Sequence, residues 1–171
     1  MPIVAIATVG LWLLARPGGG RKWKIAACSG LAAAAIGLLV NQLIAKIWDR
    51  PRPFAAHPSA HVWGSRSHDP SFPSDHASVS FAIAFAVLAF DRIAGLIFMA
   101  AALVVGVGRV FIGAHYPADV VAGALVGLAS ALIVVRLARP VLESLVRLVE
   151  RVTDPVLAAA WRILRPSASD R

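Results

Sequence analysis

The chain alternates long apolar runs with short polar stretches. The run at 25–44 has about the 20 residues that a membrane-spanning helix needs, and its many small residues allow close helix packing. Asn41 and Gln42 near its end are expected to face the interior of a bundle. The pattern predicts an all-α fold, a polytopic transmembrane helix bundle of about five spans. Its apolar runs are 2–15, 25–44, 77–90, 93–108 and 118–135.

The first apolar run, residues 2–15, is shorter than a full span. A secretory signal is the alternative, but no basic region precedes the run and no convincing small-residue cleavage site follows it. We therefore expect a short or truncated first membrane helix, with a missed upstream start as one explanation of its length.

The chain becomes basic from Arg136 onward, which predicts a C-terminal amphipathic helix on the membrane surface. Pro155 is expected to start a second short segment. We divide the chain into a transmembrane domain, 1–136, and a basic amphipathic C-terminal tail, 137–171. The charged positions Arg139, Glu143, Arg147 and Arg151 recur every four residues, opposite Val141, Leu145, Leu148 and Val152.

Composition supports a membrane protein. The 171 residues are 58% hydrophobic, with a mean hydropathy of +0.74, far above an ordinary soluble domain. The net charge of +8 is also typical of nucleic-acid binding, but the apolar runs argue against a nucleic-acid partner. Cys28 is the single cysteine, so the chain holds no internal disulfide.

Counting five spans predicts which polar segments share a side of the membrane. Loop 16–24, the turn at 91–92 and the C-terminal tail fall on one side, and their basic residues make that side cytoplasmic. The polar stretches 46–54, 73–76 and 109–119 then emerge together on the extracytoplasmic face. Their cations and histidines suit a phosphate ester whose apolar part stays in the bilayer.

The third polar stretch contains a candidate nucleophile. Pro117 favours the first turn of a helix, which puts His115 just before that helix and Asp119 in its first turn. A carboxylate there can accept the Nδ1–H of the imidazole and leave Nε2 as a nucleophile or base. Arg109, at the end of the preceding helix, can bind phosphate oxygens. The alternative is a polar loop between two membrane helices whose histidine has no role.

The other two stretches offer phosphate contacts. Pro73 and Ser74 predict a helix start, where an anion is favoured; the Ser74 hydroxyl can donate to phosphate and His76 can donate a proton. Alternatively, Ser74 is only a helix cap and His76 only packs. Arg50 and Arg52 are separated by proline and lie on stiff backbone.

These residues, in this order, resemble the three signatures of the type 2 phosphatidic acid phosphatase superfamily, whose soluble relatives include vanadium haloperoxidases and bacterial acid phosphatases. The resemblance covers roughly residues 41–128 and is greatest to the bacterial undecaprenyl-diphosphate phosphatases associated with bacitracin resistance. It rests on Arg52-Pro53, on Pro73-Ser74-Asp75-His76, and on Arg109 followed by His115 and Asp119.

The resemblance implies a multi-pass lipid phosphatase of the bacterial inner membrane, with its active site on the extracytoplasmic face. Residues 1–136 would form the phosphatase domain. His115 would attack the terminal phosphorus to give a phosphohistidine, Asp119 would orient His115, and His76 would protonate the leaving group and then activate water. The residues implied to hold phosphate are Arg52, Arg109 and Ser74, with Lys46 or Arg50 as weaker candidates.

The chain departs from the family pattern at three positions. Ala45 stands where the superfamily has a lysine, Asp75 where it has glycine, and Gly108 where it has serine. Lys46 is displaced by one residue from the lysine position. We expect Arg50 to replace that lysine and Lys46 to extend to the membrane interface.

The expected reaction is hydrolysis of undecaprenyl or another polyprenyl diphosphate to the monophosphate, in carrier-lipid recycling for cell-wall synthesis. Asp119 is the only acid in the third signature, so no Mg²⁺ site is indicated, and we expect neither metal nor cofactor. Two alternatives stay open: a phosphatase for phosphatidic acid, phosphatidylglycerophosphate or a prenyl phosphosugar, and a catalytically silent protein that binds or moves a lipid phosphate. The retained histidines and Asp119 favour an enzyme. The oligomeric state, a homo-oligomer included, is also open.

Overall fold

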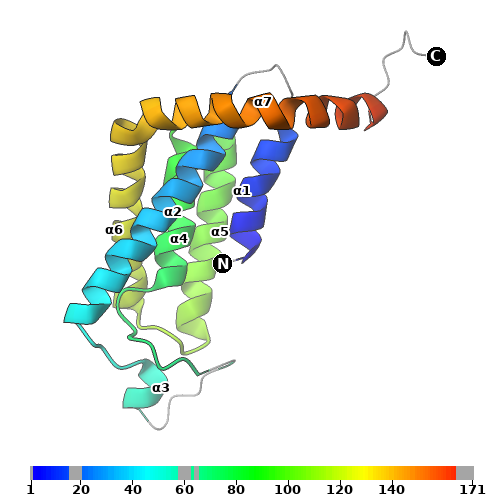
Figure 1. Cartoon of the computed structure of the whole chain (residues 1–171). Helices are drawn as coiled ribbons and strands as arrows, with labels where there is room; N and C mark the ends of the chain where they lie inside the picture. Colours follow the sequence, from blue (N-terminus) through cyan, green and yellow to red (C-terminus); the bar gives the residue numbers. More distant parts are fainter. Residues whose placement is uncertain (1, 16–20, 58–62, 64–65, 165–171) are drawn as a thin grey trace.

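The computed structural model describes residues 2–15, 21–57, 63 and 66–164. Within these ranges the chain is helical and has no strand, so the predicted all-α class is confirmed (Figure 1). The start of loop 16–24 and the tail beyond 164 lie outside the described residues. The elements are α1 (Pro2–Leu14), α2 (Lys22–Ile47), α3 (Pro53–Ala56), α4 (Asp75–Leu88), α5 (Arg92–Phe111), α6 (Pro117–Ile133), the π-helical turn η1 (Val134–Ala138) and α7 (Arg139–Leu164).

The short helix α4 is the centre of the bundle. It packs against α2, α5 and α6, and ten of its fourteen residues are buried. A helix buried on all sides has no polar stripe, which is why residues 77–90 read as an apolar run interrupted by only two small serines, Ser78 and Ser80. At 1.5 Å per residue it is about 21 Å long, short of a hydrocarbon core of about 30 Å.

All five predicted apolar helices are present, but they differ in length. Three described segments are long and apolar enough to cross a membrane: α2, α5 and the continuous segment Pro117–Ala159 that contains α6. α1 and α4, with 13 and 14 residues, are shorter. For α4 the reason is local: the residues before it bond to α6, through Ser74 N–H and the Asp119 carbonyl at 3.0 Å, rather than extending the helix.

Glycines allow α6 to lie directly on α4. A Cβ atom at Gly127 would come within 2.7 Å of the Ala82 nitrogen and the Ser78 carbonyl oxygen. A Cβ atom at Gly123 would come within 2.7 Å of the Ser74 carbonyl oxygen. This close approach brings the first turns of both helices together, which is where the predicted site residues lie.

Helix α7 lies across the far end of the bundle (Figure 1) and is attached there by ion pairs. The buried Lys24 ammonium contacts Glu150 at 3.2 Å and Asp154 at 2.5 Å, and Arg21 contacts Glu150 at 2.6 Å. A buried cation is stable only when paired, so these contacts fix α7 against the start of α2.

The sequence of α7 is amphipathic as predicted, with Val141 and Leu148 exposed on one side and Arg147 and Arg151 exposed on another. The prediction that Pro155 starts a new segment is wrong, because Pro155 lies inside α7. Pro155 is exposed, and α7 continues through it to Leu164.

Candidate active site

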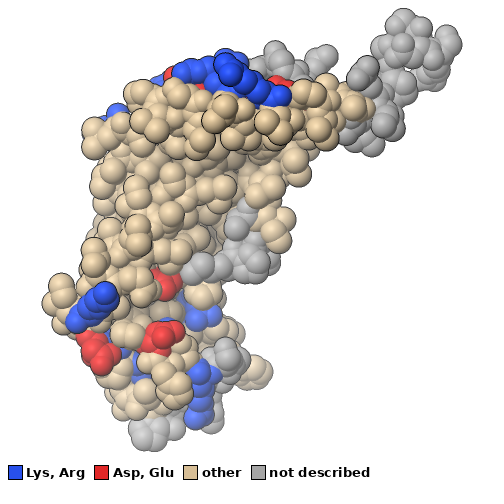
Figure 2. All heavy atoms as spheres, in the orientation of Figure 1, with Lys and Arg blue, Asp and Glu red and all other residues tan. Residues whose placement is uncertain are grey.

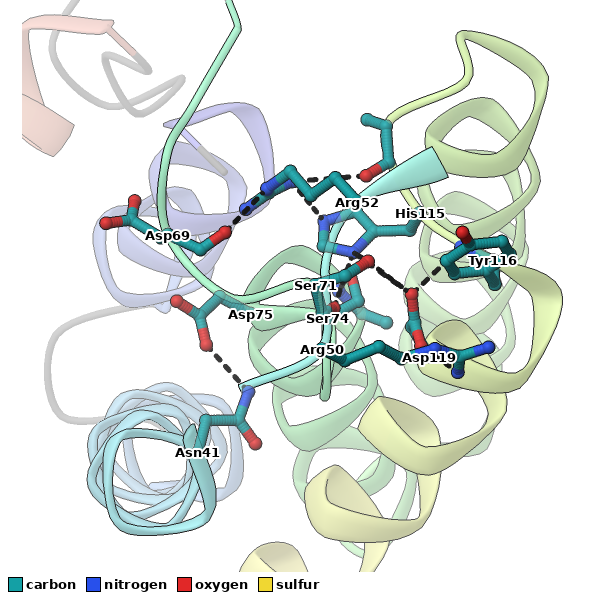
Figure 3. Close-up of polar contacts among 12 residues, drawn as sticks. Asn41, Arg50, Arg52, Asp69, Ser71, Ser74, Asp75, His115, Tyr116 and Asp119 are labelled. Atoms are coloured by element: carbon teal, nitrogen blue, oxygen red, sulfur yellow. Dashed lines mark hydrogen bonds and ion pairs between the residues drawn. The ribbon is translucent and has the colours of Figure 1, made fainter. Parts of the chain in front are cut away.

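The three polar stretches meet at the end of the bundle opposite α7. The segment just before the second stretch is joined to the first where Ser71 N–H donates to the Arg50 carbonyl at 2.8 Å. The second and third are joined where Ser74 N–H donates to the Asp119 carbonyl at 3.0 Å. The predicted convergence of these stretches is therefore confirmed, and Figure 3 shows their side chains side by side.

A cavity of about 550 Å³ lies at this junction. Both predicted histidines and two of the predicted arginines line it, from four different segments of the chain. These four residues are Arg52, His76, Arg109 and His115. The lining combines cations, imidazoles and aromatic rings, a composition that suits an anionic head group attached to an apolar chain.

His115 has the orientation that a nucleophile requires. Its side chain is almost fully buried, and its Nδ1 lies 2.8 Å from the Ser71 carbonyl oxygen. A carbonyl can only accept, so Nδ1 carries the hydrogen and Nε2 keeps a lone pair. Burial, followed by the charge of Arg52, lowers the pKa of His115 to about 4. The imidazole is therefore neutral at physiological pH and able to attack an electrophile.

Asp119 contacts His115 less directly than predicted. Its Oδ2 lies 3.8 Å from His115 Nδ1, beyond hydrogen-bonding distance. The fully buried carboxylate instead accepts from the Ser71 hydroxyl at 2.5 Å, from Tyr116 N–H at 2.9 Å and from Arg50 at 2.8 Å. The reason is that Asp119 bonds the free N–H at the start of its own helix. The Ser71 carbonyl is the acceptor for His115.

Arg109 lies in the last turn of α5 and faces the cavity, as predicted. Its Nε is buried and has no hydrogen-bond partner in the part of the chain that the structure describes. A buried charged donor without a partner is costly, so this guanidinium is ready to bind an incoming oxyanion.

Three predicted phosphate ligands lie elsewhere. Ser74 is fully buried and caps α4, with its Oγ accepting from Ala77 N–H at 3.5 Å. Lys46 is exposed in the last turn of α2, and Arg50 is turned to Asp119. None of the three lines the cavity, so the expectation that Arg50 replaces the family's lysine is not met. Arg50 instead pairs at 2.8 Å with Asp119, whose buried carboxylate requires a cation.

Sequence reasoning gave no role to Ser71 or Asp75, and both belong to the site. Asp75 lines the cavity and accepts from Asn41 at 2.7 Å, which confirms that Asn41 faces the bundle interior. The same prediction is wrong for Gln42, which is exposed at the cavity. Ser71 precedes the second signature by two residues. The one sequence signal for it is a small hydroxyl residue between two prolines, which is a weak signal on its own.

Comparison with known proteins decides the family. A family model described as the PAP2 superfamily matches residues 26–142, well over half of the chain. The chain belongs to the PAP2 superfamily. This is the superfamily that the three signatures resemble, and the matched region includes every residue of the cavity described above.

Several relatives of this PAP2 protein carry phosphatase names. It is 32% identical to undecaprenyl-diphosphatase BcrC of Bacillus subtilis, over 88% of this chain and 77% of that protein. It is 31% identical to putative undecaprenyl-diphosphatase YbjG of Escherichia coli, over 74% of this chain and 62% of that protein. It is 34% identical to decaprenylphosphoryl-5-phosphoribose phosphatase of Mycobacterium tuberculosis, over 68% of this chain and 62% of that protein.

The fold also has a solved counterpart. The crystal structure of a transmembrane PAP2 type phosphatidylglycerolphosphate phosphatase from Bacillus subtilis superposes with a TM-score of 0.54. The match covers 78% of this chain and 65% of that one at 23% identity, so it supports the shared fold alone. Together the comparisons identify the chain as a PAP2-superfamily membrane phosphatase.

Proposed function

We propose that this phosphatase hydrolyses undecaprenyl diphosphate, or another polyprenyl diphosphate, to the monophosphate and inorganic phosphate. The observation that carries the proposal is the fixed His115 imidazole, whose Nδ1–H is held by Ser71 while the ring lines a cavity with Arg52 and Arg109. Two relatives named as undecaprenyl-diphosphatases, at 31–32% identity, support the choice of lipid. The role would be carrier-lipid recycling for cell-wall peptidoglycan.

The reaction follows from these positions. The Nε2 lone pair of His115 attacks the terminal phosphorus, and the bond to the bridging oxygen breaks as His76 gives that oxygen a proton. His76 then takes a proton from water, and the hydroxide attacks the phosphohistidine and releases phosphate and neutral His115. Arg52 and Arg109 neutralise the non-bridging oxygens, which is the main requirement of phosphoryl transfer.

We further propose that no metal ion or cofactor takes part. Among the described residues, no three His, Cys, Asp or Glu side chains are grouped to hold a metal ion. The two arginines of the cavity supply the positive charge that a metal would otherwise provide.

The site is proposed to face the extracytoplasmic side of the bacterial inner membrane. Figure 2 shows Lys and Arg gathered on α7 at one end of the molecule and, among the described residues on the face that it draws, a wide belt without charged residues between the two ends. By the positive-inside tendency, the α7 end is cytoplasmic and α7 lies along that surface, as proposed for the tail 137–171.

Cysteine labelling in intact cells tests this orientation. In a Cys28→Ser background, Ala56→Cys places a thiol on an exposed position near the site, and Ser144→Cys places one on the exposed side of α7. An impermeant reagent should label the first and spare the second. Labelling of Ser144→Cys alone would put the active site on the cytoplasmic face.

A substrate panel tests the reaction. Purified enzyme in detergent, with EDTA present, should release phosphate fastest from polyprenyl diphosphate and more slowly from phosphatidic acid, phosphatidylglycerophosphate and a prenyl phosphosugar. A faster rate on one of the other lipids would reassign the substrate. Binding of these lipids without any phosphate release would support the silent-protein alternative.

A further inference from the structure

Four residues form one hydrogen-bonded chain behind the nucleophile (Figure 3). Arg50 Nη1 contacts Asp119 Oδ1 at 2.8 Å, and the Ser71 hydroxyl donates to Asp119 Oδ2 at 2.5 Å. The Ser71 carbonyl then accepts from His115 Nδ1 at 2.8 Å. These contacts therefore connect Arg50, two residues before the first signature, to the imidazole through Asp119 and Ser71.

Ser71 is fixed at all three of its polar groups. It is fully buried, its N–H donates to the Arg50 carbonyl at 2.8 Å, and its hydroxyl and carbonyl make the two contacts just described. A residue held at its amide, hydroxyl and carbonyl has little freedom to rotate. The position of its carbonyl, and with it the direction of the His115 ring, depends on Asp119.

Arg50 is placed to hold Asp119 rather than a substrate. Its guanidinium contacts Asp119, and the central carbon of the guanidinium lies 4.2 Å from the centre of the Tyr116 ring. Arg50 is not among the residues that line the cavity. Asp119 is fully buried, and a buried carboxylate requires a paired cation. Arg52, two residues later, is the arginine that reaches the imidazole, at 3.2 Å from Nε2.

We propose that Arg50 and Ser71 are positioning residues of the phosphatase, acting on His115 through Asp119. They hold the Ser71 carbonyl where it fixes the Nδ1–H tautomer and aims Nε2 at the phosphorus. The proposal rests on the proposed role of His115 as nucleophile. It assigns Arg50 a role different from that of a phosphate ligand.

The two roles of Arg50 predict different kinetics. Loss of a phosphate ligand weakens binding of the ground state as well as the transition state, so KM rises. Loss of a positioning residue misaligns the nucleophile without removing a substrate contact, so kcat falls while KM stays constant. Misplacement of a reacting group can lower a rate by about 100-fold.

The experiment compares steady-state kinetics of Arg50→Gln, Arg50→Lys and Ser71→Ala with the unmodified enzyme on polyprenyl diphosphate. We expect kcat to fall about 10- to 100-fold in Arg50→Gln and Ser71→Ala with KM unchanged, and Arg50→Lys to recover part of the loss because it keeps the charge but not the planar fork. Matched controls are Arg66→Gln, an exposed arginine, and Ser80→Ala, a buried serine whose hydroxyl has no partner among the described residues. Both should keep kcat.

A double-mutant cycle separates positioning through Asp119 from an independent effect. In an Asp119→Asn background, Arg50→Gln should cause almost no further loss of kcat, because its partner is already altered. Fully additive losses, or a raised KM at constant kcat in Arg50→Gln, would overturn the proposal that Arg50 positions His115 through Asp119. If Arg50→Gln does not fold, the same kinetic split in Arg50→Lys and Ser71→Ala decides.

The kinetic results distinguish failure of the positioning proposal from failure of the proposed function. An unmodified enzyme that releases no phosphate contradicts the proposed function itself. An active unmodified enzyme whose Arg50 and Ser71 variants keep kcat contradicts only the proposed positioning role of these two residues.

Discussion

A guanidinium nitrogen of Arg52 lies 3.2 Å from Nε2 of His115, the nitrogen that we assign as the nucleophile. A cation at this position opposes protonation of the ring and at the same time lies where a phosphate oxygen must be held. In the proposed mechanism Arg52 therefore adds to the effect of burial in lowering the pKa of His115 and also binds the phosphate group that His115 attacks.

The first prediction concerns pH. Burial and Arg52 lower the pKa of His115 to about 4, so the free enzyme keeps a neutral imidazole far below pH 6.5. Activity that needs this neutral form is lost only as pH falls through the lowered pKa. In a profile of kcat/KM, which reports groups of the free enzyme, His115 should limit activity near pH 4.

The control for this prediction is Arg52→Gln. Removing the cation removes one of the causes that lower the pKa, so the acid limb that His115 controls should move to higher pH as the overall rate falls. An acid limb that stays in place would mean that Arg52 does not act on His115.

The second prediction compares two cations. Arg109→Ala should raise KM and lower kcat, because its guanidinium lines the cavity with a buried Nε that has no partner among the described atoms. Lys46→Ala should leave both constants within about twofold, since surface charges away from a site contribute little. The measurement is initial rate against polyprenyl diphosphate at matched expression. A larger loss in Lys46→Ala would mean that the displaced lysine does reach the phosphate.

The third prediction concerns packing. Gly127→Ala would press a methyl group against the α4 backbone, and overpacking of this kind costs about 1–3 kcal/mol. For a chain of this size, Tm in detergent should fall by about 2–4 °C for each kcal/mol. Gly108→Ala is the matched control, because its Cβ would meet no described atom within 4 Å. If both variants unfolded at the same temperature, α6 and α4 would not be in backbone contact.

Local sequence patterns predicted much of this site. Arg109 lies in the last turn of α5, Pro117 begins α6 and Ser74 caps α4, as the sequence predicted. The convergence of the three stretches follows from counting apolar runs, because successive helices of a bundle place alternate connections at the same end.

The sequence could not predict the partners of side chains outside the helices. Ser71 lies in the irregular segment before α4, where spacing gives no information on direction. The sequence suggested Arg50 as a phosphate ligand because it lies two residues from Arg52 on stiff backbone, yet its contact is with a buried carboxylate from a distant segment. The prediction that residues 77–90 form a full membrane span failed for a similar reason. Burial inside the bundle makes α4 apolar, but with 14 residues it is too short to count as a span.

The histidine intermediate is the central claim, and trapping it is the most direct test. Polyprenyl diphosphate labelled in its terminal phosphate is mixed with enzyme, quenched in base, and the protein is analysed for an acid-labile phosphohistidine. His76→Ala should slow turnover by about 10²–10⁴-fold and accumulate the label on His115, whereas His115→Ala should show neither label nor turnover. Phosphate release that continues in His115→Ala, or label on any other residue, would contradict the account.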